Sequence, residues 1–269
     1  MRTHGRPARY NARLMNESDG ENEPNETDGL QQRGERFARA LFAFEDALDW
    51  ARLEELYCDG DAEGFFDEER RASLREAGLH VADDLARYLG VAVPEPGASV
   101  YFGGSAAELA PWLSEVVVLE RPRAHLLNQG VEARLLEEAR RRVRERDGLE
   151  LPPVLTALEE LPGPLGHVWL VSVLTDPVAF PALHDELYER PGEANAARTS
   201  SVEVELPRAR ALLSQLFGAA SPGALLTTTE EELGLARSVA EDAGRSIELV
   251  RAGPLTALVG DRLLYCRIR

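Results

Sequence analysis

The spacing of hydrophobic positions changes twice along the chain. Residues 1–30 have almost no periodic apolar positions and are rich in polar residues, so we expect a disordered leader that buries too little surface to offset its ordering entropy. From 31 to 96, apolar residues recur at three- and four-residue spacing, which predicts a helical N-terminal region. From 97 to 269, short apolar runs alternate with helical stretches, which is typical of an α/β domain.

The stretch 97–121 carries the strongest local pattern of this domain. An apolar run is followed by Gly103 and Gly104, a short helical segment, and a second apolar run over 116–119 that ends at Glu120. Strand, glycine turn, helix, strand and acid is the pattern of a Rossmann-type βαβ unit, in which glycine lets the backbone approach a ligand. We therefore expect Glu120 at the tip of the second strand, where it would accept hydrogen bonds from a ribose.

Later apolar runs predict the rest of the sheet. The runs at 152–158, 167–174 and 224–229 are expected as further strands, and that at 167–174 is almost unbroken, as in a strand covered on both faces. Two apolar segments within 246–268 predict a terminal antiparallel pair. The expected fold is a doubly wound, mostly parallel seven-stranded α/β sheet with a C-terminal antiparallel hairpin, preceded by the helical region.

Polar residues after the fourth predicted strand are candidates for a site. Thr175 and Asp176 stand just past its carboxyl end, where open α/β sheets bind ligands, although an Asp–Pro pair also starts turns. His184 falls in the polar insertion 177–200, which is either a substrate lid or a surface connection. If the protein is an enzyme, Asp176 or His184 is the expected proton acceptor.

Charge and composition argue against several classes of function and of binding partner. A net charge of −17 argues against general binding to nucleic acid or to an anionic membrane. The chain has no lysine, which excludes Schiff-base chemistry and a Walker-type phosphate loop. Cys58 and Cys266 lie far apart and the histidines are scattered, so we expect no metal site and no disulfide. Without an apolar span or signal, we expect a cytoplasmic protein.

The order of these elements resembles the class I S-adenosylmethionine-dependent methyltransferases over residues 97–269, with Gly103, Gly104 and Glu120 as its residue-level support. The resemblance implies S-adenosylmethionine as cofactor, with the glycine loop against its methionine part, Glu120 on the ribose and Thr175 nearby. It also implies that the N-terminal helices cover the active site. The first loop departs from the family pattern because it lacks the opening acid and the later glycines.

Two functions follow from the resemblance. The first is a methyltransferase that acts on an unknown small-molecule or protein acceptor, with proximity as its main source of rate. The second is a catalytically inactive relative that binds a protein partner, with the N-terminal region as the expected surface. A nicotinamide-dependent oxidoreductase ranks third, because the first loop fits the dinucleotide motif no better and the terminal hairpin is unexpected there.

Overall fold

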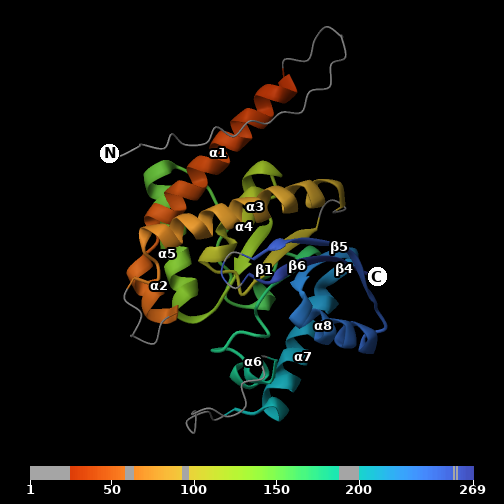
Figure 1. Cartoon of the computed structure of the whole chain (residues 1–269). Helices are drawn as coiled ribbons and strands as arrows, with labels where there is room; N and C mark the ends of the chain where they lie inside the picture. The colour runs from red at the N-terminus through yellow and green to blue at the C-terminus, as the bar shows by residue number, and fades with distance from the viewer. Residues whose placement is uncertain (1–24, 58–63, 93–96, 188–199, 257, 259) are drawn as a thin grey trace, which may run out of the picture.

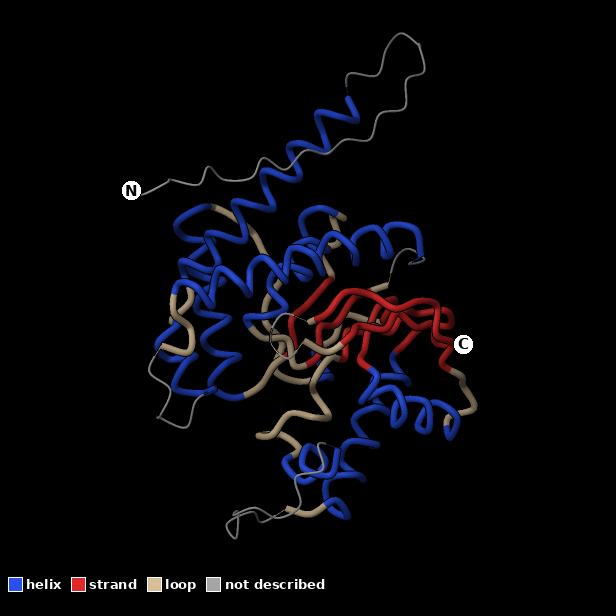
Figure 2. Tube along the Cα trace, viewed as in Figure 1, coloured by secondary structure: helices blue, strands red, loops and turns tan. Residues whose placement is uncertain are grey.

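A computed structural model describes residues 25–57, 64–92, 97–187, 200–256, 258 and 260–269. A central sheet separates two layers of helices (Figures 1 and 2). The helices of the described residues are α1 (Asn25–Ala47), α2 (Trp50–Tyr57), α3 (Glu68–Ala92), α4 (Leu109–Leu113), α5 (Gly130–Asp147), α6 (Pro181–Leu187), α7 (Val202–Ala219) and α8 (Glu230–Asp242). Residues 25–30 of the predicted leader thus begin α1, and the rest of the leader lies outside the described residues.

The sheet is mixed and has the order β2-β1-β3-β4-β6-β5. Its strands are β1 (Ala98–Phe102), β2 (Ala124–Leu127), β3 (Leu165–Leu170), β4 (Ala220–Thr229), β5 (Ile247–Leu255) and β6 (Arg262–Ile268). The first four strands are parallel to one another, whereas β6 runs antiparallel to both β4 and β5. The predicted α/β class is confirmed, and the observed sheet is mixed, with parallel pairing among β1 to β4 and antiparallel pairing of β6.

The seven-strand count is not reproduced in the described residues. The segment predicted as the third strand, 152–158, forms a single parallel bridge between Leu127 and Leu155 and no continuous ladder. Two flanking prolines, Pro152 and Pro153, lack the N–H that a ladder needs. The segment therefore lies beside β2 without becoming a seventh strand.

The predicted second strand is also in the wrong place. Residues 116–119 belong to a helical segment, because α4 continues into a π-helical turn at Ser114–Val118. Leu109, Leu113 and Val117 are buried at four-residue spacing, which places them on one helical face toward the core. A short apolar run fits a strand and a buried helix equally well, and here the packing selects the helix. The true second strand, β2, begins at Ala124.

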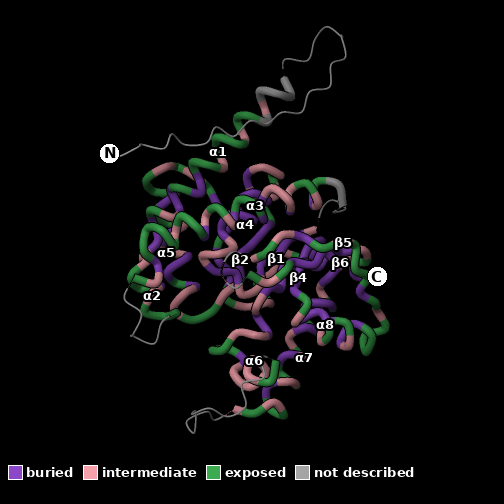
Figure 3. The backbone as a smooth tube through the Cα atoms, viewed as in Figure 1, coloured by how far each residue is buried: buried purple, intermediate pink, exposed green. Residues whose placement is uncertain are grey.

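Both faces of the sheet are covered, so the central strands are buried (Figure 3). One apolar cluster joins one sheet face to α1, α3, α4 and α5, and a second joins the other face to α7 and α8. The whole of β3 is buried, as the unbroken apolar run predicted. No helix in the described part of the chain is both long and apolar enough to span a bilayer.

The arginines near the end of α5 hold α1 in place. The Arg142 guanidinium donates to the Ala47 carbonyl at 2.9 Å, and that of Arg146 donates to the Ala43 carbonyl at 3.2 Å. The Ala47 carbonyl lies in the last turn of α1, where carbonyls lack intrahelical donors, whereas the Ala43 carbonyl lies one turn earlier. Arg142 therefore caps α1, and both arginines fasten the helical region to α5.

The edge strand β5 is irregular. Its pairing with β6 shifts register between Leu249 and Arg251 and again between Ala252 and Leu255. Pro254 lies within the strand and supplies no N–H. The result is an edge with two breaks in its ladder.

A buried carboxylate connects one face of the sheet to the π-helical turn. Glu115 accepts hydrogen bonds from the hydroxyls of Ser99 and, at 2.8 Å, Tyr101, and its other contacts are Arg121 at 3.0 Å and His167 Nδ1 at 3.1 Å. His167 Nε2 lies 3.0 Å from the Thr227 hydroxyl, which extends the network to β4. Burial raises the pKa of Glu115, but its neighbours, His167 foremost, outweigh burial and hold the pKa below its ordinary value.

Glu115→Ala is expected to lower the free energy of unfolding by roughly 3–5 kcal/mol, because it leaves the buried groups of His167, Tyr101 and Arg121 without their acceptor. Urea denaturation measures the change. Glu138→Ala is the matched control, since Glu138 is a half-exposed member of an i,i+4 pair on α5 and its loss should cost under about 1 kcal/mol. Equal losses for the two variants would contradict the structural role of Glu115.

Candidate functional site

The glycine turn follows β1 as predicted. Gly103 has a φ of 69°, its N–H donates to the Leu127 carbonyl at 2.8 Å, and the Gly104 N–H donates to the Tyr101 carbonyl at 3.1 Å. A Cβ on Gly103 would lie 2.7 Å from Val173 Cγ2, and one on Gly104 would lie 2.9 Å from the Tyr101 carbonyl oxygen. Both glycines are therefore required by close packing, and a side chain at either position would force the turn open.

The helical turn after the glycines has its own cap. The Ser105 N–H donates to Glu108 Oε2 at 2.8 Å, and the Ala107 N–H donates to the Ser105 hydroxyl at 3.1 Å, which is a capping box. Burial raises the pKa of Glu108. The N–H groups of Gly103, Gly104, Ser105 and Ala107 are thus paired within the chain, which leaves few donors in the turn for a pyrophosphate.

Asn128 occupies the tip of β2. Its side-chain amide donates to the Gly104 carbonyl at 2.9 Å and to Glu132 Oε2 at 3.0 Å. Glu132 lies in the first turn of α5, and its Oε1 accepts a hydrogen bond from the Tyr57 hydroxyl at 3.0 Å. We call Tyr57, Glu108, Asn128 and Glu132 the strand-edge cluster. Glu108 follows the turn after β1, Asn128 follows β2, Glu132 lies in α5, and Tyr57 is the last residue of α2.

The electrostatics of this cluster are dominated by carboxyl groups. The pKa of Glu132 is raised to about 7, mainly by burial and to a smaller extent by the charges of Glu108 and Asp176, while the hydrogen bonds from Tyr57 and Asn128 act in the opposite direction. Burial and the charge of Glu132 also raise the pKa of Tyr57 well above its ordinary value, so the phenol stays protonated and donates to the carboxylate. Burial thus disfavours the ionised form of both the Glu108 and the Glu132 carboxyls, and a cation bound beside Glu132 would favour its ionisation.

Glu120 does not belong to this site, contrary to the sequence prediction. It precedes β2 instead of ending it, so it lies at the opposite edge of the parallel strands. Its side chain is 61% exposed and 3.4 Å from Arg33 of α1. The backbone of Glu120 has a φ of 53°, the left-handed conformation that ends the π-helical turn.

Thr175 and Asp176 follow β3 at the carboxyl edge, as predicted. Asp176 Oδ1 accepts from the N–H groups of Val178 and Ala179 at 2.8 and 2.7 Å, so this carboxylate starts a turn. Its effect on the pKa of Glu132 shows that its charge acts on the strand-edge cluster. The polar position was predicted from sequence, whereas its electrostatic effect on Glu132 was not.

The loop between β3 and Asp176 is held by a buried acid of α8. Glu232 Oε1 accepts from the N–H groups of Val173 and Leu174, both at 2.7 Å, and burial raises the pKa of this carboxyl to about 7. The loop positions Val173 against Gly103. Ser172 adopts a left-handed φ of 56°, a backbone strain that these two bonds help to sustain.

His184 lies on α6, with its Nδ1 3.2 Å from Asp185 Oδ1. α6 packs against α7, on the second helical layer (Figure 1). Its role as proton acceptor stays a prediction. Among the described residues no group of histidine, cysteine or acidic side chains is arranged to hold a metal ion.

Sequence reasoning missed Asn128, Glu132 and Tyr57. The apolar run 124–127 followed by Asn128, Gln129 and Gly130 is a strand-and-turn signal, but the run 116–119 was chosen as the strand instead. Tyr57 lies within the predicted helical region, and its reach to α5 could not be predicted because it depends on how two segments distant in sequence pack.

No family model matches the sequence, and a search of curated proteins returned no match. Solved structures of similar fold include magnesium protoporphyrin IX methyltransferase from Synechocystis PCC 6803 with bound SAM, at 17% identity over 81% of this chain and 90% of that chain, with a TM-score of 0.45. TrmN from Thermus thermophilus matches at 12% identity over 72% and 52%, with a TM-score of 0.40. A methyltransferase from Pyrococcus furiosus matches at 14% over 69% and 82%, with a TM-score of 0.38.

The class of fold follows from the sheet itself. Parallel strands alternate with helices, and the last strand inserts antiparallel between β4 and β5. This is the class I methyltransferase-like arrangement that the sequence resemblance implied.

The raised pKa of Glu232 predicts that the free energy of unfolding depends on pH. With a pKa of about 7 when folded and an ordinary 4.5 when unfolded, Glu232 holds a proton in the folded state that the unfolded chain releases. Stability should therefore be highest near pH 5 and fall as pH rises through 7, by roughly 1–3 kcal/mol from this group. Glu232→Gln keeps an acceptor oxygen for Val173 and Leu174 and is expected to reduce the fall.

Urea denaturation at pH 5, 6.5 and 8 measures this effect. Glu241→Gln, an exposed acid on the same helix, is the control and should leave the pH dependence unchanged. A Glu232→Gln variant with the full wild-type dependence would show that this carboxyl does not bind the proton.

Proposed function

We propose that the chain is a methyltransferase-like protein that binds S-adenosylmethionine at the carboxyl edge of the sheet, beside Gly104, Asn128 and Glu132, and transfers a methyl group to an unknown acceptor. The observation that carries the proposal is the accumulation of carboxyl groups at this edge, with the pKa of Glu132 raised to about 7. A sulfonium is a cation, and it would be attracted to the partly buried Glu132 carboxylate once that group is ionised.

The same observation argues against a nicotinamide dinucleotide. A pyrophosphate carries negative charge and binds to free backbone N–H groups at a helix N-terminus. Here the capping box of Ser105 and Glu108 occupies the N–H groups of Ser105 and Ala107, and the neighbouring side chains are acidic. The glycine turn alone is compatible with either S-adenosylmethionine or a nicotinamide dinucleotide. The acidic side chains of this edge favour S-adenosylmethionine.

When bound, S-adenosylmethionine would supply the electrophilic methyl group. Asn128 and Glu132 replace Glu120 as the candidates that hold the nucleoside, because they stand at the tip of β2 next to the glycine turn. Tyr57 fixes the orientation of the Glu132 carboxylate. Thr175 remains a proposed contact, and Asp176 remains the proposed proton acceptor from the substrate, since it lies at the same edge.

Calorimetry with S-adenosylmethionine tests the proposal. The wild-type protein is expected to bind, Glu132→Gln to bind at least tenfold more weakly, and Glu120→Ala to bind as the wild type does, because Glu120 lies at the opposite edge. Affinity should rise between pH 6 and 8 as Glu132 ionises. Absence of heat with the folded wild-type protein, at both pH values, would overturn the proposal.

A second candidate is a non-catalytic methyltransferase-fold protein. Two observations favour it: Val173 packs against Gly103, and the donors of the turn are paired internally. On this alternative the edge is closed by the chain's own side chains and the fold serves to bind a protein. It predicts that neither S-adenosylmethionine nor S-adenosylhomocysteine raises the thermal unfolding temperature of the wild-type protein.

A further inference from the structure

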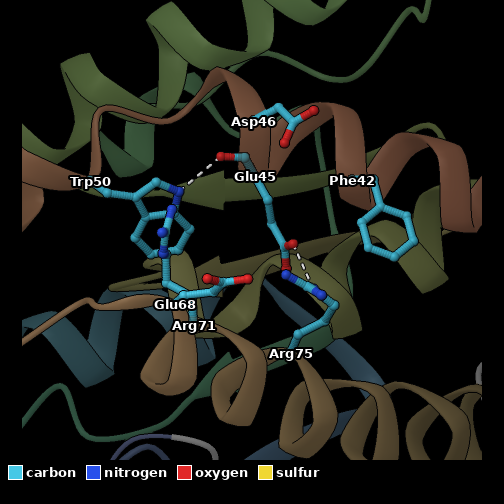
Figure 4. Close-up of a pocket in the computed structure, with 7 residues that line it drawn as sticks. All are labelled: Phe42, Glu45, Asp46, Trp50, Glu68, Arg71 and Arg75. Atoms are coloured by element: carbon cyan, nitrogen blue, oxygen red, sulfur yellow. Dashed lines mark hydrogen bonds and ion pairs between the residues drawn. The ribbon is translucent and has the colours of Figure 1, made fainter. Parts of the chain in front are cut away.

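A hollow of about 340 Å³ opens between α1, α2 and α3, separate from the strand-edge cluster (Figure 4). We call it the α1–α3 hollow. It is lined by Phe42, Glu45, Asp46, Trp50, Glu68, Arg71 and Arg75. Figure 4 shows Trp50 and Phe42 on opposite sides, with the acids and arginines between them.

Internal contacts occupy both arginines of the hollow. The Arg75 guanidinium donates to Glu45 Oε2 at 2.7 Å and lies 5.0 Å from the centre of the Phe42 ring. That of Arg71 lies 5.6 Å from the centre of the Trp50 ring, and the Trp50 indole N–H donates to the Glu45 carbonyl at 2.9 Å. These groups form a fixed floor of paired charges and aromatic rings.

The rim of the hollow has a different character. Asp46 and Glu68 are exposed and have no hydrogen bond or ion pair among the residues that the structure describes. Phe42 is 52% exposed, a large apolar surface for a residue of this kind. Three carboxyl groups face two guanidinium groups, so the hollow is net negative on a chain of net charge −17.

We propose that the α1–α3 hollow is a docking site for a basic segment of a partner protein, in which an apolar side chain packs on Phe42 and adjacent arginine or lysine groups pair with Asp46 and Glu68. Charge complementarity favours this occupant, because the acids at the rim are unpaired and the arginines of the floor are already satisfied. Aromatic residues and arginine next to exposed acids are typical of protein-binding hot spots with steering charge.

Trp50 gives a direct readout of occupancy. The chain has three tryptophans, of which Trp112 and Trp169 are 0% and 2% exposed, so Trp50 is the one within reach of a ligand. Titration of the full chain with a capped peptide of alternating leucine and arginine is expected to change the tryptophan emission in a saturable way. The same peptide with glutamate in place of arginine, and one with serine in place of leucine, should bind at least tenfold more weakly.

Variants test the ionic and the apolar contacts of the proposed site separately. Asp46→Asn combined with Glu68→Gln is expected to weaken the leucine–arginine peptide at least tenfold and to reduce the salt dependence of binding. Phe42→Ala should weaken the peptide while leaving that salt dependence in place. Glu76→Gln is the matched control, an exposed acid on α3 that does not line the hollow.

Thermal unfolding of each variant confirms that it is folded before titration. No saturable change with the leucine–arginine peptide, equal affinity for the glutamate peptide, or full affinity in the Asp46→Asn, Glu68→Gln variant would each overturn the proposal. Preference for the glutamate peptide would instead assign the hollow to an acidic partner through Arg71. None of these outcomes depends on cofactor binding, so the proposal stands or falls apart from the proposed function.

Discussion

Buried carboxylates hold this fold together. Glu115 connects the π-helical turn to β1 and β3, and Glu232 holds the loop after β3. Glu205 of α7 accepts from the N–H groups of Ala182 and Leu183 at 2.8 and 3.0 Å and thereby anchors α6. Each acid is buried and satisfies backbone or side-chain donors that no sheet ladder reaches. The loops that form the carboxyl edge depend on these bonds for their position.

The candidate site is a consequence of that positioning. Because parallel strands end at one edge, the turn after β1, the tip of β2 and the loop after β3 meet there, and each contributes polar groups. The helical region adds Tyr57 from α2. The site is therefore assembled from four segments distant in sequence. Its acids, Glu108, Glu132 and Asp176, influence one another only because the fold brings them close together.

The sequence was sufficient to predict the layers and most of the strands, because the unbroken run of β3 and the helical spacing before residue 97 are long patterns. It was insufficient at the crossover after β1. There, four apolar residues fitted a strand, but burial of Leu113 and Val117 favours the helix. Because of that single displacement, Glu120 was expected at the tip of the second strand, where the structure places Asn128, followed by Glu132 in the first turn of α5. Gly103, Gly104 and Asp176 were placed correctly at the edge, because turn chemistry is local.

Arginines and acids are distributed differently over the molecule. All 30 lysine-or-arginine positions are arginine, and several guanidinium groups cap helices or stack on rings. Acids are in excess, and within the described residues they gather at the strand-edge cluster and at the rim of the α1–α3 hollow, among other places. Our two proposals each assign a positively charged ligand to one of these two places, a sulfonium nucleoside to the first and a basic peptide to the second.

The irregular course of β5 has a consequence for how this molecule meets others. An outermost strand with a straight ladder would present a row of open N–H and C=O groups on which a foreign strand can grow, the route to fibrils and to runaway polymers. Two register breaks and a proline interrupt that row, so the margin of the sheet is a poor template. Pairing of another protein's strand with β5 is therefore disfavoured. Contacts made through side chains, which are reversible and sensitive to salt, are favoured by comparison.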